Sequence, residues 1–224
     1  MIENLRPLLY YPLGLLPPIF FTLRVLIQWI QSERHRRSYV GRTFWRLSLA
    51  GNLLLILHYF VQVQFPFALL QVGNAVISWR NLNLMNSKNP CSTKRTVAVL
   101  LASFALMTVA FLAQSHYIIG KVDWIRTPTK VFDAATLHHS LGWHILGTIG
   151  VALFSFRFWI QWWQAETSKR SVLSKNFWWF SIIGSVIALV YFVRIHDNVS
   201  ILTYGCGLIP YFRNLFLMKQ KPVT

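Results

Sequence analysis

Two segments of this chain carry nearly the same pattern, and each places a cation and two amides inside an apolar, aromatic stretch. Residues 21–33 read FTLRVLIQWIQSE, and residues 154–166 read FSFRFWIQWWQAE. Arg24 therefore corresponds to Arg157, 133 positions further along the chain. Internal repeats of this kind are typical of membrane proteins that fold as two similar halves.

The match continues without a gap on both sides of these segments. At the same offset Leu13-Gly14 matches Leu146-Gly147, Arg37-Ser38 matches Arg170-Ser171, Phe44-Trp45 matches Phe177-Trp178, Ser48 and Gly51 match Ser181 and Gly184, and Arg80-Asn81-Leu82 matches Arg213-Asn214-Leu215. We therefore predict two repeats, residues 8–85 and 141–218. The segment between them, residues 96–115, has no counterpart and is predicted to be a linking transmembrane helix.

Composition places these repeats in a membrane. Hydrophobic residues make up 54% of the chain and charged residues only 12%, whereas soluble domains carry about 25% charged residues. Seven apolar segments are long enough to cross roughly 30 Å of hydrocarbon as helices: residues 8–31, 43–63, 67–85, 96–115, 141–163, 175–195 and 199–218. The sequence therefore predicts an all-α integral membrane protein with seven transmembrane helices.

The formal net charge of +16 would suggest a nucleic-acid partner in a soluble chain. Here the basic residues lie in short clusters between the apolar segments, which is the pattern that sets orientation in a membrane. The main clusters are Arg34, Arg36, Arg37 and Arg42; Lys88, Lys94 and Arg95; Lys169, Arg170 and Lys175; and Lys219 and Lys221. With seven crossings all four lie on one side, so we expect an outer N-terminus, a cytoplasmic C-terminus and no nucleic-acid partner.

The number of helices in each repeat decides how the repeats are related. Each predicted repeat holds three helices, and the unmatched fourth helix returns the chain to the side on which it began. Both repeats then share one orientation, related by an axis along the membrane normal. Such a 3+1+3 arrangement of parallel repeats occurs in SWEET transporters, where the substrate lies between the halves.

The repeated motif also carries a family resemblance. Each repeat contains R-x-x-I-Q-W-x-x-x-E, then R-S, F-W-x-x-S-x-x-G and a final R-N-L. This pattern resembles the lipid A biosynthesis N-terminal domain, found before the glycosyltransferase in lipid-A-disaccharide synthases of the chlamydial type. That family is grouped with PQ-loop and SWEET-like proteins, although Ile27 and Ile160 stand where a PQ-loop has its proline. The resemblance implies a protein of the bacterial inner membrane with a role in lipid A or envelope-lipid metabolism.

The candidate site follows from the polar residues of the repeated motif. Arg24, Gln28 and Gln31 share one helical face, and Arg157, Gln161 and Gln164 repeat the spacing. An arginine at the bilayer centre costs about 2.5–3.5 kcal/mol and normally faces a partner or a cavity. The two faces would form a cationic site between the repeats, suited to a phosphate. Polar stripes on the third and seventh segments complete it: Asn74, Ser78, Asn81, Tyr211 and Asn214.

Structural alternatives exist for these residues. Arginine side chains near a helix end can reach the membrane surface, and small or polar residues often hold membrane helices together. Glu33 and Glu166 have basic residues three and four positions later, which predicts local ion pairs. Arg80 and Arg213 lie near helix ends and are expected to anchor the helices or contact lipid head groups.

No catalytic or metal-binding motif is apparent in the sequence. His138, His139 and His144 lack a Cys, Asp or Glu at a spacing that would complete a metal site. A Gly-rich phosphate loop, a nucleophile elbow and paired carboxylates are also missing. We therefore expect no metal, no cofactor and no catalytic residue.

The preferred function is binding or translocation of a phosphorylated lipid or sugar-lipid between the two repeats. The alternative is a non-catalytic membrane domain or anchor for a cytoplasmic glycosyltransferase, and a homo-oligomer is compatible with either. A third hypothesis is that the chain itself is a lipid-A-disaccharide synthase. The glycosyltransferase domain itself is expected to be absent, so the chain alone should form no disaccharide.

Overall fold

The apolar segments form helices in the computed structural model, which describes residues 2–36, 38–86, 89–125, 140–168, 171 and 173–218. The helices are α1 (Ile2–His35), α2 (Arg42–Val61), α3 (Phe65–Asn86), α4 (Thr93–Gln114), α5 (Leu141–Ser168), α6 (Lys175–Arg194), α7 (Asn198–Gly205) and α8 (Leu208–Leu217). A π-helical turn, η1 (Ser115–Ile119), continues α4. For the described residues, the prediction of an all-α fold is confirmed.

Five of these helical segments are long and apolar enough to cross a membrane: α1 from Asn4, α2, α4 together with η1, α5 and α6. Helix α3 has 22 residues but is not among them. Its buried residues include Gln71, Asn74, Ser78 and Asn81, and these polar groups lower its hydropathy.

The prediction of one continuous helix over residues 199–218 is wrong. The chain forms α7 and α8 instead, separated by Cys206 and Gly207. Two glycines, Gly205 and Gly207, lie at the break, and glycine is a poor helix former. The Tyr211 ring fills the space beside Gly207: a Cβ atom there would lie 2.1 Å from the Tyr211 hydroxyl.

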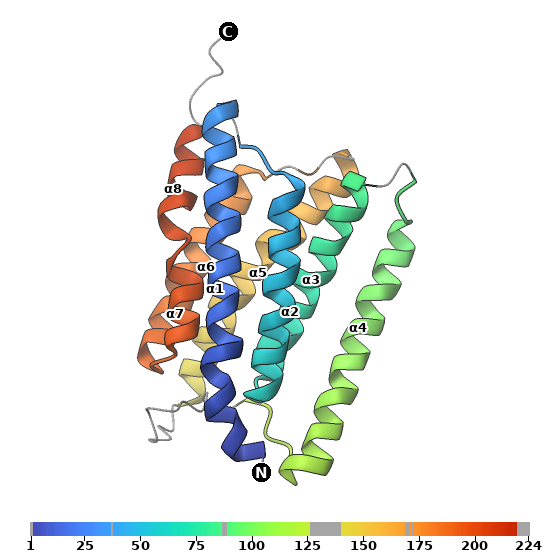
Figure 1. Cartoon of the computed structure of the whole chain (residues 1–224), viewed down its shortest axis with the longest axis vertical. Helices are drawn as coiled ribbons and strands as arrows, with labels where there is room; N and C mark the ends of the chain where they lie inside the picture. Colours follow the sequence, from blue (N-terminus) through green and yellow to red (C-terminus); the bar gives the residue numbers. More distant parts are fainter. Residues whose placement is uncertain are drawn as a thin grey trace.

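Helices α1 to α6 alternate in direction, and α7 and α8 together run along the bundle in one direction, so α1 begins at one end and α8 finishes at the other (Figure 1). Helices α1, α2 and α3 pack in sequence, and α5 packs in sequence against α6, which contacts α7 and α8. The two groups meet along two seams, α3 with α5 and α1 with α7 and α8. Each seam thus joins the first helix of one group to the last of the other.

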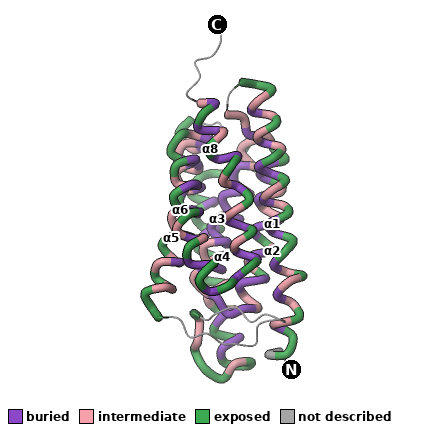
Figure 2. The backbone as a smooth tube through the Cα atoms, turned by 90° about the vertical axis from the view of Figure 1, so that its left-hand side faces the viewer, coloured by how far each residue is buried: buried purple, intermediate pink, exposed green. Residues whose placement is uncertain are grey.

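Helix α4 lies outside this arrangement. Its principal partner among the other helices is α3, and it stands at the edge of the bundle (Figure 1). Figure 2 shows α4 mostly exposed, while the inner sides of the other helices are buried. Leu101, Leu106 and Val109 on α4 are 61%, 71% and 60% exposed. Such a surface is unfavourable in water and suits a lipid environment.

Close packing of α5 on α6 depends on Gly184. A Cβ atom at Gly184 would lie 2.4 Å from the Phe154 backbone nitrogen, and a backbone atom cannot swing aside as a flexible side chain can. At the equivalent residue, Gly51, an added Cβ atom would meet the Phe21 ring, also at 2.4 Å. The contact at Gly184 is therefore the less adaptable of the two.

We expect Gly184→Ala to lower the free energy of unfolding by about 1–3 kcal/mol, because the added methyl group overpacks the α5–α6 contact. Unfolding in detergent, followed by circular dichroism, measures the change. Gly142→Ala is the matched control, since a Cβ atom there would lie 3.9 Å from its nearest neighbour, Ser140 Oγ. Equal stability of the two variants would contradict this account of the packing.

Candidate functional site

Polar residues of α1 and α5 meet the other half of the molecule at three levels. On α1 these are Arg24, Gln28 and Glu33, which span about 13 Å along the helix at 1.5 Å per residue. On α5 they are Arg157, Gln161 and Glu166 at the same spacing. We name the levels by these residues: the arginine level holds Arg24 and Arg157, the amide level Gln28 and Gln161, and the clasp level Glu33 and Glu166.

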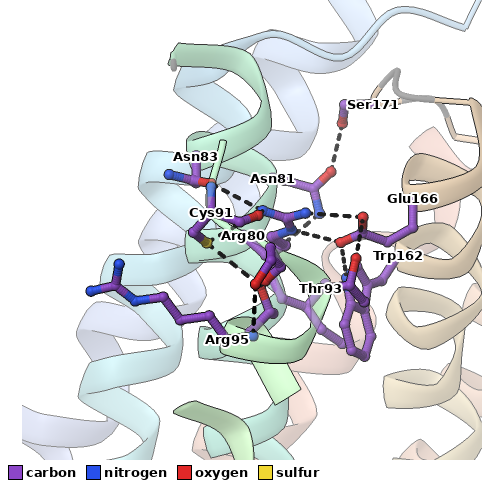
Figure 3. A network of polar contacts seen from close by, with 12 residues as sticks. Arg80, Asn81, Asn83, Cys91, Thr93, Arg95, Trp162, Glu166 and Ser171 are labelled. Carbon is purple, nitrogen blue, oxygen red and sulfur yellow. Dashed lines mark hydrogen bonds and ion pairs between the residues drawn. The ribbon is translucent and has the colours of Figure 1, made fainter. Parts of the chain in front are cut away.

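At the clasp level, Glu166 on α5 forms a bidentate ion pair with Arg80 on α3 (Figure 3). The Glu166 Oε1–Arg80 Nε distance is 2.6 Å, and the Oε2–Nη2 distance is 2.9 Å. The Trp162 indole and the Thr93 hydroxyl also donate to this carboxylate. Arg80 further donates to the Cys91 carbonyl at 2.6 Å. Its side chain is only 2% exposed.

The equivalent residues form the same pair on the other seam. Arg213 on α8 donates to both carboxylate oxygens of Glu33 on α1, at 2.7 and 3.2 Å, and the Trp29 indole donates to the same carboxylate. This pair is more open: the Glu33 and Arg213 side chains are 37% and 38% exposed.

The sequence-based prediction did not include these two pairs. Among the described residues, the ion-pair partners of Glu33 and Glu166 lie on helices of the other half. Arg80 and Arg213 are therefore ion-pair partners across the seams rather than free anchors. A signal for this was available, because the motif of each repeat holds one acid and one arginine at matching positions. Arg37, Lys169 and Arg170, proposed as local partners, lie outside the described residues.

At the amide level, Gln28 on α1 and Asn214 on α8 exchange two hydrogen bonds, at 2.9 and 3.1 Å. Gln161 on α5 and Asn81 on α3 do the same, at 2.8 and 2.9 Å. All four side chains are fully buried. The Ser171 hydroxyl also donates to Asn81 Oδ1. These reciprocal amide pairs hold the two halves together, as buried amides do between membrane helices.

At the arginine level, both cations are buried against one aromatic ring. Arg24 and Arg157 are 2% and 1% exposed, and their guanidinium carbons lie 5.4 and 4.7 Å from the Phe158 ring centroid. Arg24 also lies over Phe21 at 4.4 Å, and Arg157 lies over Phe154 at 3.4 Å. The sequence-predicted convergence of the two arginines at the interface of the halves is present in the structure.

The arginines lack enough partners for their donors. Arg24 donates from Nη1 to the Ser48 hydroxyl at 2.7 Å, but its Nε has no hydrogen-bond partner among the described residues. Nε and Nη1 of Arg157 are also without a described partner. The described ion pairs use other residues, so no described carboxylate pairs with either arginine. Two buried cations with free donors are costly in a membrane unless an anion joins them.

The remaining predicted site residues divide into two groups. Asn74 donates to Ser155 across the α3–α5 seam at 3.1 Å, and the Tyr211 ring lies 5.5 Å from the Arg157 guanidinium carbon. Ser78 is buried and donates to the Asn74 carbonyl. Gln31 and Gln164 are only half-buried, and none of the described hydrogen bonds joins their side chains to the other half. They therefore lie apart from the convergent arginines.

A buried polar cluster at the opposite end of the bundle was not anticipated. The Tyr10 hydroxyl donates to the Asp197 carboxylate, which caps α7 by accepting from the backbone N–H and hydroxyl of Ser200. His58 lies 5.3 Å from the Tyr10 ring and is fully buried, with neither ring nitrogen hydrogen-bonded among the described residues. The only hint in the sequence is that Asp197 is one of just six acidic residues.

Of the three histidines considered as metal ligands, the described residues include only His144. His144 hydrogen-bonds through Nδ1 to the Tyr191 hydroxyl at 2.8 Å. His138 and His139 lie outside the described residues.

Comparison with known proteins identifies the family. Residues 13–83 and again residues 146–216 match the model of the lipid A biosynthesis N-terminal domain. The chain belongs to this family, in two tandem copies. The matched ranges lie within the two predicted repeats, residues 8–85 and 141–218, and membership associates the chain with lipid A biosynthesis.

The curated relatives are lipid-A-disaccharide synthases from Chlamydia. The chain is 40% identical over 211 residues to the enzyme of Chlamydia felis, a region covering 94% of this chain and 33% of the relative. It is 39% identical over 221 residues to the enzyme of Chlamydia pneumoniae, covering 99% of this chain and 35% of the relative. The chain thus spans about a third of the length of these relatives. No solved structure matches the chain.

Proposed function

We propose that this protein binds a phosphorylated lipid or sugar-lipid of lipid A metabolism between its two repeats, with the phosphate at the arginine level. The observation that carries the proposal is the pair Arg24 and Arg157, buried against Phe158 with unpartnered donors and no described carboxylate. A guanidinium matches phosphate oxygens in a bidentate manner. A phosphate would therefore supply both the missing charge and the missing acceptors.

The neighbouring levels support a site that opens and closes. The amide pairs and the ion pairs lie between the arginines and one end of the bundle, and both kinds of pair join opposite halves. Parting of one seam would break one amide pair and one ion pair together. We propose that such parting admits the lipid from the membrane, and that closure holds it.

The membrane arrangement is part of the same proposal. Seven crossings in a 3+1+3 order, with parallel repeats as in SWEET-like transporters, would place the arginine level near the middle of the bilayer. The basic clusters favour a cytoplasmic C-terminus and an outer N-terminus in the bacterial inner membrane. In this arrangement the clasp level faces the cytoplasm, and translocation of the lipid would require the opposite end to open as well.

The direct test is binding of a phosphorylated, acylated sugar by the purified full-length protein. We expect Arg24→Gln combined with Arg157→Gln to weaken binding at least tenfold, because each charge-assisted phosphate contact contributes about 1.5–3 kcal/mol. Microscale thermophoresis in detergent measures the change. A dephosphorylated analogue should bind the native protein as weakly as the phosphorylated lipid binds the variant.

Gln31→Ala combined with Gln164→Ala is the matched control for this test. These glutamines belong to the same motif but do not join the other half in the described contacts. We expect their variant to bind like the native protein. Unchanged binding in the folded double arginine variant would exclude the proposed site.

A second candidate is a non-catalytic membrane partner of a glycosyltransferase. It is supported by the relatives, which are synthases about three times the length of this chain. Co-purification of a glycosyltransferase from the native membrane would support this function. Disaccharide formation by the purified chain alone would count against both candidates.

A further inference from the structure

A second lipid-binding feature lies on the outside of the bundle, away from the arginine level. Helices α2, α3 and α4 enclose a groove of about 480 Å³, within the roughly 300–1,000 Å³ of typical small-molecule sites. Its walls include Leu53, Ile56, Val76, Trp79, Val99 and Leu106. The groove exists because α4 packs chiefly on α3 and leaves the side facing α2 unfilled.

The groove belongs to the membrane face and not to the interface of the halves. Ser48 on α2 points inward and accepts from Arg24, whereas the next residue, Leu49, lines the groove. Leu53 and Leu106 in its walls are 51% and 71% exposed. In a bilayer these walls would meet acyl chains.

The length of the groove is about half the thickness of the hydrocarbon core of a bilayer. The lining residues of α4 run from Val99 to Ala110, about 16 Å at 1.5 Å per residue. The hydrocarbon core of a bilayer is roughly 30 Å thick. The lining residues lie in the middle part of α2, α3 and α4, so the groove accommodates a large part of one acyl chain.

Positive charge lies at the end of the groove near the clasp level. Arg95 precedes Val99 by one turn of α4, and Arg46 precedes Leu49 by about one turn of α2. Both arginines are exposed, and neither takes part in a described ion pair. The Arg95 side chain points away from the Arg80–Glu166 network (Figure 3).

We infer that this groove binds one acyl chain of an acidic glycerophospholipid, with the lipid phosphate held by Arg46 and Arg95. The apolar lining selects a hydrocarbon chain, the length of the groove suits a large part of one acyl chain, and the two arginines one turn beyond its lining select an anionic head group. The inference goes beyond the proposed function, because none of its residues belongs to the arginine level.

The test is native mass spectrometry of the full-length protein in detergent with equal amounts of phosphatidylglycerol and phosphatidylcholine. We expect one phosphatidylglycerol to be retained at least tenfold more than phosphatidylcholine. Ser103→Trp, which fills the groove, should abolish this retention, and Ala110→Phe serves the same purpose if the first variant does not fold. Ala152→Trp is the matched control, because it fills a smaller apolar groove of about 250 Å³ on the other side of α4.

The head-group contact has a separate test. Arg46→Gln with Arg95→Gln should abolish the preference, so that phosphatidylglycerol and phosphatidylcholine are retained about equally. Arg34→Gln with Arg36→Gln removes the same charge from the end of α1 and should preserve the preference. Equal retention of both lipids by the native protein, or equal losses in the test and control variants, would overturn the inference.

The variants distinguish the lipid site in the groove from the proposed phosphate site at the arginine level. Arg24→Gln with Arg157→Gln should leave retention of phosphatidylglycerol unchanged. If that variant loses phosphatidylglycerol while the groove variants keep it, the acidic lipid binds at the arginine level and the groove is excluded.

Discussion

Glu166→Ala is expected to destabilise the protein by about 3 kcal/mol or more, whereas Glu33→Ala should cost at most about 1 kcal/mol. The two glutamates are equivalent in the repeats, and each forms a bidentate pair with an arginine. Loss of Glu166 leaves the Arg80 guanidinium, only 2% exposed, without its anion, and breaking a buried pair from one side costs about 3–5 kcal/mol. Arg213 is 38% exposed and remains solvated without Glu33.

Unfolding of the purified protein in detergent, followed by circular dichroism, measures both changes. The double variant Arg80→Met with Glu166→Met removes both charges and should recover most of the lost stability, because a well-packed apolar pair can replace a buried ion pair. Equal destabilisation by Glu166→Ala and Glu33→Ala would show that burial does not distinguish the two pairs.

Arg157→Met is expected to stabilise the ligand-free protein by about 1 kcal/mol, in contrast to Glu166→Ala. The same variant should abolish binding of the phosphorylated sugar-lipid. A charged arginine deep in a membrane costs about 2.5–3.5 kcal/mol. Its contact with the Phe154 ring, at 3.4 Å, returns about 2 kcal/mol. Methionine removes the charge and allows a favourable contact between its sulfur and the Phe154 ring.

Stability and binding are measured on the same purified samples, by unfolding and by thermophoresis. Arg80→Met is the matched control, since Arg80 is equally buried but has an acidic partner. It should destabilise the protein. If Arg157→Met destabilises the protein as much as Arg80→Met does, the arginine level is structural and the proposed ligand site is wrong.

Much of the fold could be predicted from local patterns. Hydropathy located the helices, because a helix forms wherever a long apolar stretch can satisfy its own backbone groups in a membrane. The gapless repeat also predicted that Arg24 and Arg157 would converge, and the structure places both against Phe158. Whether a phosphate binds there remains a prediction.

The partners of the polar residues could not be predicted in the same way. Glu33 has basic residues within four positions, so the local pattern favoured pairing on its own helix. Its described partner, Arg213, is 180 positions away and becomes a neighbour only when α1 packs against α8.

The sequence by itself determined two nearly equal repeats with the same acid, amide and arginine in each. Only the tertiary structure decided that equivalent pairs differ in burial, 2% for Arg80 against 38% for Arg213. The physical reason is the connection from α3 to α4: Cys91, just before α4, and Thr93, its first residue, hydrogen-bond to the pair of Arg80 with Glu166. A repeat in the sequence sets which groups are present, but the helices that pack around each copy set how strongly those groups interact.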